Sequence, residues 1–554
     1  MADRIESYKV ISQGGLNSNE NHLDLAENLP GAATRLVNYE VSLFGGYRRI
    51  NGYEKLDPDY GEVGGSNATG KVLSVAIYKD DTVDNAFIIA ARQDATPDPN
   101  GDGTNTYSVY KYQALIGWTK ISNNIVLYMT DNLFRTVDIV RHVSFNFGDG
   151  NKMAFADGVN NGYIFDGTNF VSLSSTGTGT EQDAGGDQLV NKPSLVDIFE
   201  NHLFFGGDAG SQAVIVHSAP EDPYNFTAAS GGGQLPVGFD VVQFKPFRDN
   251  LFVFGYNAIK KVSADITAGF ILDQVTSNVG CIAANSVLEI GGDLVFLAPD
   301  GIRPVAGTAK IGDVELETIS KSIQSILVDL PVDYDLDKLL TGVVIRTKSQ
   351  LRYFVGDDQL QQLDSMGIIG GLRTSDQKLG WEFGELLGIR ASCATSGYIG
   401  RTEFVLHGDY NGVIYRQEIG NTFDGGGILG IYSTPYYDFG DTEVRKILRK
   451  VNTFVRSEGP LTMNVSVQYD WNDTSTAKPP SYAQSSEGAP VIYNGRNIIY
   501  GGTNIKYGGN EKPIMVTDVQ GSGYAVKVTY VTIGENFPHS IQGIVFEFSV
   551  AGRR

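Results

Sequence analysis

The sequence predicts an all-β protein, in which a β-propeller is followed by a C-terminal β-sandwich-like platform. Three observations support this fold class. Glycine is abundant at 67 residues and Tyr and Phe contribute 28 each, a profile typical of aromatic strands joined by glycine turns. Seven segments repeat a strand–turn–strand pattern at a mean spacing of about 53 residues, which suits a four-stranded blade. After about residue 430 the strands become longer and alternate cleanly.

The repeating unit consists of an apolar alternating strand, a tight turn with Asp, Asn or Gly, and a second alternating strand. "KMAFADGVNNGYIFDGTNFVSLS", from Lys152 to Ser174, shows it plainly. The turn residues tolerate positive φ, so each copy should form an antiparallel hairpin. The first strong apolar residues of the copies are Phe87, Met153, Leu203, Leu251, Leu294, Leu351 and Phe404. We prefer six blades, because one of the seven hairpins can lie in a split blade or outside the ring.

The chain is expected to divide into three regions. Residues 1–30 hold few strand signals and are interpreted as an N-terminal arm, residues 31–430 as the propeller, and residues 431–554 as the platform. Long alternating segments such as "LTMNVSVQYD" and "IQGIVFEFSV" favour a pair of packed sheets. Helical periodicity is scarce, and its best candidate runs from Leu316 to Leu327.

The charge balance is acidic, with 64 acidic and 43 basic residues and a net charge of −21. This opposes a protein that grips nucleic acid, which needs a basic surface, but an acidic wall can let DNA pass without sticking. The two cysteines, Cys281 and Cys393, lie far apart, so folding in a reducing compartment is expected. No apolar run approaches a membrane span, and "MADRIESYKVISQGG" lacks the core of a signal peptide.

A nucleotide-binding loop is suggested by the spacing of Gly65, Gly70 and Lys71 in "GGSNATGKVLSVAIY". Such a loop needs a Ser or Thr after the lysine for Mg²⁺ and must open a helix. Position 72 is Val, and the following residues suit a strand. The segment is therefore interpreted as the loop that enters the first propeller strands.

Metal and catalytic signals are weak. Asp98, Asn100 and Asp102 in "DPNGDGTN" match the start of a calcium loop, but the twelfth position is Val109 and not the closing Glu. The segment is either a weak calcium site or an acidic hairpin tip, and no other cofactor is expected. The six histidines show no metal spacing, and no serine lies in a G-x-S-x-G elbow. We expect no enzyme; the alternative is a propeller hydrolase acting on glycans through paired carboxylates.

A basic cluster, "RKILRK", stands out in this acidic chain. It contains Arg445, Lys446, Arg449 and Lys450. These side chains could dock an acidic partner, or they could protect a strand edge against unwanted pairing.

Several segments resemble the tail nozzle proteins of short-tailed bacteriophages, also called tail tubular or tail hub proteins. The likeness begins with "GGLN" at Gly14 and "GAATRLVNYEVSLFGGYRRINGYEKL" at Gly31. It continues in "VIVHSAPEDPYNF", "TSNVGCIAANSVLEIGGDLVFLAPDGIRPVAGT" and "ISKSI", and it ends with "PYYDFGDTEVRKILRK" and "FEFSVAGRR". The segments span nearly the whole chain, and none is a catalytic signature.

The resemblance implies a structural virion protein. Members of that family form a homohexameric nozzle below the adaptor, or head-to-tail connector, ring. They close the tail before infection and conduct DNA during ejection without sequence-specific binding, and tail fibres or spikes commonly attach near the adaptor. The implied location is the virion tail, after assembly in the host cytoplasm. The family's gate residues have no motif that can be assigned here.

Overall fold

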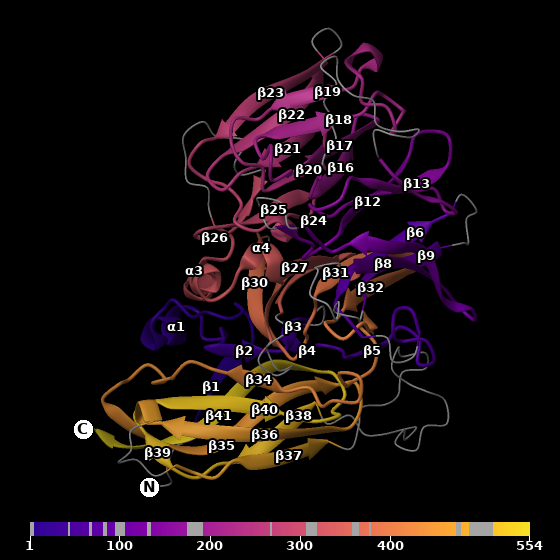
Figure 1. Ribbon diagram of the computed structural model, residues 1–554. Helices are drawn as coiled ribbons and strands as arrows, with labels where there is room; N and C mark the ends of the chain where they lie inside the picture. The colour runs from indigo at the N-terminus through magenta and orange to yellow at the C-terminus, as the bar shows by residue number, and fades with distance from the viewer. Residues whose placement is uncertain are drawn as a thin grey trace.

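The computed structural model describes residues 5–42, 45–65, 69–80, 86–94, 106–129, 135–173, 192–265, 269–305, 318–356, 365–375, 378–472, 478–486 and 513–553. The chain is mostly β, and six small sheets form a six-bladed β-propeller with further sheets built largely from the C-terminal part (Figure 1). Within the described residues no helix is long and apolar enough to cross a membrane.

The six blades are antiparallel meanders that follow one another along the chain. Blade 1 contains β6 (Val72–Lys79), β7 (Ala86–Gln93), β8 (Thr106–Gln113) and β9 (Gly117–Val126). Blade 2 contains β12 (Arg141–Asn146), β13 (Asn151–Ala156), β14 (Tyr163–Phe165) and β15 (Phe170–Ser172). Blade 3 contains β16 (Leu195–Phe199), β17 (His202–Gly206), β18 (Val214–His217) and β19 (Gly233–Pro236). The short pair β10 (Tyr128–Met129) and β11 (Arg135–Thr136) links blades 1 and 2.

Blade 4 contains β20 (Gln243–Phe247), β21 (Asn250–Phe254), β22 (Ile259–Asp265) and β23 (Gly269–Thr276). Blade 5 is the three-stranded sheet of β24 (Leu288–Ile290), β25 (Asp293–Ala298) and β26 (Gly301–Pro304). Blade 6 contains β31 (Cys393–Ile399), β32 (Thr402–Gly408), β33 (Ile414–Gln417) and β5 (Tyr53–Lys55). Because β5 comes from the N-terminal part, pairing between distant segments closes this blade, and β31 then contacts β6 of blade 1.

A further meander lies between blades 5 and 6. It contains β27 (Leu340–Ile345), β28 (Gln350–Val355), β29 (Met366–Ser375) and β30 (Lys378–Leu387). β27 contacts β24 on one side and β31 on the other, while β30 pairs with β2 (Arg35–Val37) of a nine-stranded sheet. The meander therefore connects the ring of blades directly to the platform.

The prediction of repeated antiparallel hairpins is confirmed. All seven repeated apolar positions, from Phe87 to Phe404, fall in the second strand of their own meander, in β7, β13, β17, β21, β25, β28 and β32. The hairpin at Leu351 belongs to the meander that runs into the platform, and the other six belong to the six separate blades. Ser66, Asn67 and Ala68 of "GGSNATG" lie outside the described residues, and β6 begins just after this segment, at Val72, as the first strand of blade 1.

The platform consists of two packed sheets. One sheet contains β3 (Tyr39–Val41), β4 (Tyr47–Arg49), β41 (His539–Arg553), β35 (Val444–Ser457) and β38 (Ile514–Asp518), with β1 (Ile5–Ile11) on β41 and β39 (Ser522–Gly523) on β35. The other continues from β2 through β34 (Gly430–Ser433), β40 (Val526–Thr532), β36 (Leu461–Tyr469) and β37 (Tyr482–Ser486). Val451 and Phe546 of the first sheet share one buried core with Val465 and Val528 of the second, so the expected sandwich packing is present.

The N-terminal region differs from the expected arm. β1 pairs with β41 along its full length, from Ile5 opposite Ser549 to Ile11 opposite Gly543. β2, β3 and β4 also join the platform sheets, and the chain enters the propeller only at β5. The expected boundaries at residues 31 and 431 therefore cut through a platform that both ends of the chain build. The reason is long-range strand pairing, which leaves no local signal in the first 50 residues.

Helices are few among the described residues. α1 (His22–Asn28) begins at Asn21, whose side chain accepts from the Leu23 backbone N–H. α3 (Gln324–Asp333) follows a 3₁₀ turn (Lys321–Ile323) and precedes α4 (Leu336–Leu339). The helix expected between Leu316 and Leu327 is thus shifted toward the C-terminus, and residues 306–317 lie outside the described part of the chain.

Candidate functional site

The basic cluster lies on β35, near one end of the platform. Arg445 and Arg449 are exposed, with Arg445 Nε donating to Ser522 Oγ at 3.0 Å and Arg449 Nε to Ser549 Oγ at 3.3 Å. The Lys450 ammonium lies 4.0 Å from the Asp518 carboxylate, and both side chains are solvent-exposed. Exposed pairs of this kind contribute little to folding and leave the cations accessible to a partner.

Lys446 differs from the other three cations, although the sequence analysis grouped all four as exposed candidates for an acidic partner or for a protected strand edge. Its side chain is buried, and Nζ donates to the Tyr524 carbonyl at 3.1 Å and also to the Asp441 carbonyl. Burial lowers the pKa of this ammonium. The cause is strand alternation: Lys446 shares the inner face with Leu448, while Arg445 faces out. A β-bulge between Leu448 and Lys450 then turns both Arg449 and Lys450 outward.

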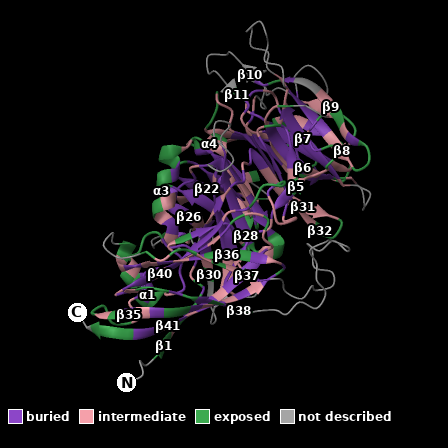
Figure 2. Cartoon of the chain, turned by 90° about the horizontal axis from the view of Figure 1, so that it is seen from below, coloured by how far each residue is buried: buried purple, intermediate pink, exposed green. Residues whose placement is uncertain are grey.

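The outer face of this sheet has three rows of side chains running from β1 across β41 and β35 to β38. The register gives the rows Ile11–Gly543–Phe454–Ile514, Lys9–Val545–Asn452–Val516 and Ser7–Glu547–Lys450–Asp518. The first row is mainly apolar and the third is charged. Ile11 is 52% exposed and Val516 47%, so this mixed face is open to solvent among the described residues (Figure 2). We call these three rows with Arg445 and Arg449 the platform face.

The calcium candidate cannot be placed. Asp98, Asn100 and Asp102 all lie outside the described residues. Elsewhere, in the part of the chain that is described, no three His, Cys, Asp or Glu side chains gather as metal ligands. Cys281, in the connection between β23 and β24, and Cys393, at the start of β31, are both free and buried, so the structure holds no bond between them.

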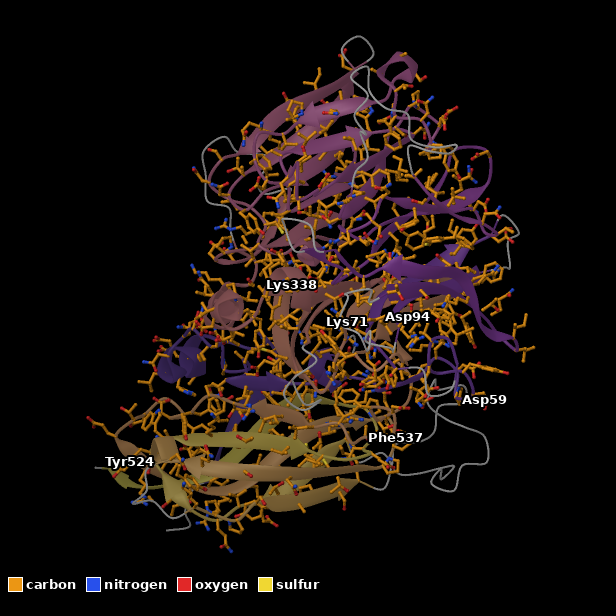
Figure 3. The ribbon with its side chains drawn as sticks, viewed as in Figure 1. Asp59, Lys71, Asp94, Lys338, Tyr524 and Phe537 are labelled. Atoms are coloured by element: carbon orange, nitrogen blue, oxygen red, sulfur yellow. The ribbon has the colours of Figure 1, made fainter. Side chains whose placement is uncertain are left out.

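Two cavities lie on the propeller axis, where the first strands of the blades converge. The larger has a volume of about 400 Å³ and is lined by Asp138, Asp157, Tyr256, Asp337 and Lys338 among others. The smaller has a volume of about 210 Å³ and is lined by Ser74, His142 and Lys245 among others. Arg141, at the start of β12, lines both cavities and lies between them. Figure 3 labels Lys338 of α4, which is one of the residues that line the larger cavity.

The carboxylates around the larger cavity differ in the hydrogen bonds that they accept. Asp157 accepts from the Tyr107 hydroxyl at 2.7 Å and from the backbone of Val159 and Asn160. Asp337 accepts from the Tyr256 hydroxyl at 2.8 Å. Burial raises the pKa of all three carboxyl groups, Asp138, Asp157 and Asp337. Sequence patterns could not bring these residues together, because they come from different blades and from α4.

A buried ion network joins the propeller to the platform. Glu40 of β3 accepts from Arg48 at 2.8 Å and from Lys348 at 2.7 Å. Glu418, just after β33, accepts from Lys348 at 2.5 Å and from Arg352 of β28 at 2.5 Å. The side chains of Glu40 and Arg352 are 2% and 1% exposed. The network therefore pairs the buried Glu40 and the half-buried Glu418 with three cations from both regions, a constellation that the sequence analysis missed.

No family model matches the chain, and no curated protein matches it either. Solved structures do show similarity. One of them, titled "KlHsv2 with loop 6CD replaced by a Gly-Ser linker", is similar over 56% of this chain and 97% of its own length, at 10% identity and a TM-score of 0.25. A likeness this distant carries no argument about activity or partners. The fold itself defines the chain as a β-propeller protein with an attached platform.

Proposed function

We propose that this protein is the tail nozzle subunit of a short-tailed bacteriophage, acting as a homohexameric conduit for DNA below an adaptor ring. The observation that carries the proposal is where the resembling segments lie in the structure. The segment from Gly31 to Leu56 forms β2 to β5, the segment from Pro435 to Lys450 leads into β35, and the terminal "FEFSVAGRR" ends β41. The first and last of these pieces lie near opposite ends of the sequence, yet together the three build the platform and its junction with the propeller.

The charge distribution is consistent with this role. Six copies of a chain with a net charge of −21 carry a total of −126, six times the single value. Assembly must therefore keep most acidic groups away from the contacts. The platform face offers Arg445, Arg449 and Lys450 beside exposed aliphatic side chains, which suits an acidic surface on a neighbouring copy or on the adaptor. An acidic channel wall would repel DNA over roughly 8 Å at physiological salt and keep it mobile.

The test is the state of the purified chain, alone and with its adaptor. Native mass spectrometry and negative-stain class averages should show a sixfold ring with a central channel, alone or once the adaptor is added. A chain that stays a monomer of 60.0 kDa under both conditions would remove the proposal. A ring whose channel is lined mainly by Lys and Arg would overturn the charge argument while leaving the assembly intact.

A propeller hydrolase acting on glycans is the second candidate. The observation that favours it is the gathering of Asp138, Asp157 and Asp337 around the larger axial cavity, with burial raising the pKa of each carboxyl group. Two carboxyl groups with different protonation states are the requirement for glycoside hydrolysis. Release of reducing sugar by the monomer from a glycan library, lost in Asp138→Asn, would favour this candidate over the nozzle.

A further inference from the structure

The axial cavity contains a cation that no carboxylate neutralises by direct contact. Arg141 Nε donates to Asn285 Oδ1 at 3.1 Å, and Nη1 donates to the Ser194 carbonyl at 3.1 Å. Both acceptors are neutral, and among the described residues no acceptor is found for Nη2, which stays accessible from the cavity. Burial lowers the pKa of the guanidinium to about 10, a value at which it is still charged at neutral pH.

Such a cation is costly to maintain. Arg141 is half-buried, and a partly buried charge without a charged partner is destabilising, so proteins normally pair it or neutralise it. The same molecule does so in its ion network, where Arg352 contacts both Glu40 and Glu418. The open position at Arg141 Nη2 therefore points to a group from outside the chain, one that accepts hydrogen bonds and carries negative charge.

The opposite charge lies on the wall of the same cavity. Asp138 accepts no hydrogen bond from any described residue, and burial raises the pKa of its carboxyl group, an effect that attraction to Lys71, Lys338 and Arg141 only partly offsets. Asp337 accepts from the Tyr256 hydroxyl and from the backbone of Ala284, and its pKa is also raised by burial. Both carboxylates interact electrostatically with Arg141 without forming an ion pair with it. The cavity wall therefore carries the cations of Arg141 and Lys338 together with the carboxylates of Asp138, Asp157 and Asp337.

We propose that the larger cavity binds a small zwitterion of the α-amino acid type, with its carboxylate toward Arg141 and its ammonium toward Asp138 and Asp337. A simple anion would be repelled by Asp138, Asp157 and Asp337, which line the same cavity, and a simple cation would leave Arg141 without a charged partner in direct contact. A neutral polyol would supply hydrogen bonds but no charge for either end. The volume of about 400 Å³ suits a ligand of this size. The inference does not depend on the proposed place in a virion.

The experiment is isothermal titration calorimetry of the full chain with the neutral L-amino acids as probes. Acetate and methylammonium are the matched controls, because together they contain the two charged groups of glycine, and glucose is the polyol control. At least one amino acid should bind at least tenfold more tightly than either half-ligand. Asp138→Asn should weaken that binding at least tenfold without lowering the urea midpoint, whereas Asp273→Asn, at an exposed position on β23, should leave the binding unchanged.

Three results would overturn the proposal. One is that no amino acid binds at concentrations up to about 10 mM. Any remaining affinity would then be too low for a specific small-molecule site. Another is equal binding of the best amino acid and acetate, which would make the site a plain anion site. Tighter binding of glucose than of any amino acid would make it a polyol site. If Arg141→Gln folds by circular dichroism and retains full binding, the assignment of the carboxylate end is wrong.

Discussion

Two regions of the molecule hold charged side chains partly or fully away from water: the ion network between propeller and platform, and the cavity on the propeller axis. The two regions differ in how these charges are paired. In the network, Glu40 and Glu418 each accept from two or more cations, and the Arg48 side chain adds a two-point contact to Glu458 at 2.6 and 2.9 Å. In the cavity, Arg141 bonds only neutral acceptors and Asp138 has no donor among the described residues. Charged groups that all have oppositely charged partners indicate a structural junction. Charged groups that lack such partners and line a cavity indicate a site for a ligand.

The largest expected effect follows from breaking the network. Arg352→Leu removes the donor to Glu418 Oε1 at 2.5 Å and leaves both carboxylates short of a cation. The free energy of unfolding should fall by about 3–5 kcal/mol. Urea unfolding followed by circular dichroism measures the change. Lys338→Leu is the control, because its pair with Asp335 is exposed and is worth less than about 1 kcal/mol. Equal losses in the two variants would mean that the network is not a junction.

Acid should weaken the fold before the carboxylates of the network are protonated. Burial lowers the pKa of His407 and His539 to about 3 and that of His142 to about 4. Below pH 6.5 these histidines are therefore protonated in the unfolded chain but stay neutral in the folded chain. Their contribution to stability is complete above that pH and is lost progressively as the pH drops toward 3 or 4. Each histidine contributes a slope of about 1.4 kcal/mol per pH unit in this window.

The measurement is the urea midpoint at intervals from pH 7 to pH 5. His407→Gln should be less stable at pH 7, because His407 packs against the Tyr415 ring and contacts Gln417. Its stability should nevertheless depend less steeply on pH than that of the parent chain. A parent profile that is flat between pH 6.5 and 5 would contradict the assignment of these groups as neutral in the fold.

The platform face provides a middle case, in which cations are exposed and only weakly paired. Arg445→Glu with Arg449→Glu should weaken assembly with a neighbouring copy or the adaptor at least tenfold, because each reversal places like charge at the contact. Folding of the single chain should change by less than about 1 kcal/mol, since both side chains are exposed. Sedimentation with adaptor present measures the first effect and urea unfolding the second.

The matched control for that reversal is Arg248→Glu with Arg401→Glu, which adds the same charge at exposed positions in the propeller. Unchanged assembly of the double Arg445 and Arg449 variant would remove the platform face from the mechanism. Equal weakening by both double variants would show that only the total charge of the ring matters.

The blades were predictable from the sequence, whereas the junctions were not. Alternating strands and Gly, Asn or Asp turns are local signals, so the sequence alone places Met153 and Leu203 in equivalent strands. The pairing of Ile5 with Ser549 and the contact of Lys348 with Glu40 join residues hundreds of positions apart, and no local pattern carries them. The buried position of Lys446 could have been predicted from the sequence, because Lys446 and Leu448 are two residues apart and therefore lie on the same face of the strand.

The smallest expected effect comes from Asp138, and it is best compared with that of Glu40. Replacing the carboxylate by an amide should change the free energy of unfolding in opposite directions at these two residues. Burial alone would raise the pKa of Glu40, but Lys348, with Arg48 and Arg352, holds it below its usual value, so its charge stabilises the fold above about pH 4.5 and this contribution is lost as the pH falls further. Burial raises the pKa of Asp138, so its charge opposes folding at neutral pH.

Glu40→Gln should therefore lower the free energy of unfolding at pH 7 by about 3 kcal/mol, since it leaves Lys348 and Arg48 without their partner. Asp138→Asn should raise that free energy by less than about 1 kcal/mol, and the gain should vanish below about pH 3.8, where the carboxyl group is protonated in both states. Paired urea titrations at pH 7 and pH 3.5 test both signs. A destabilising Asp138→Asn at pH 7 would show that this carboxylate is already satisfied in the fold, and the distinction between a completed junction and a ligand site would then be lost.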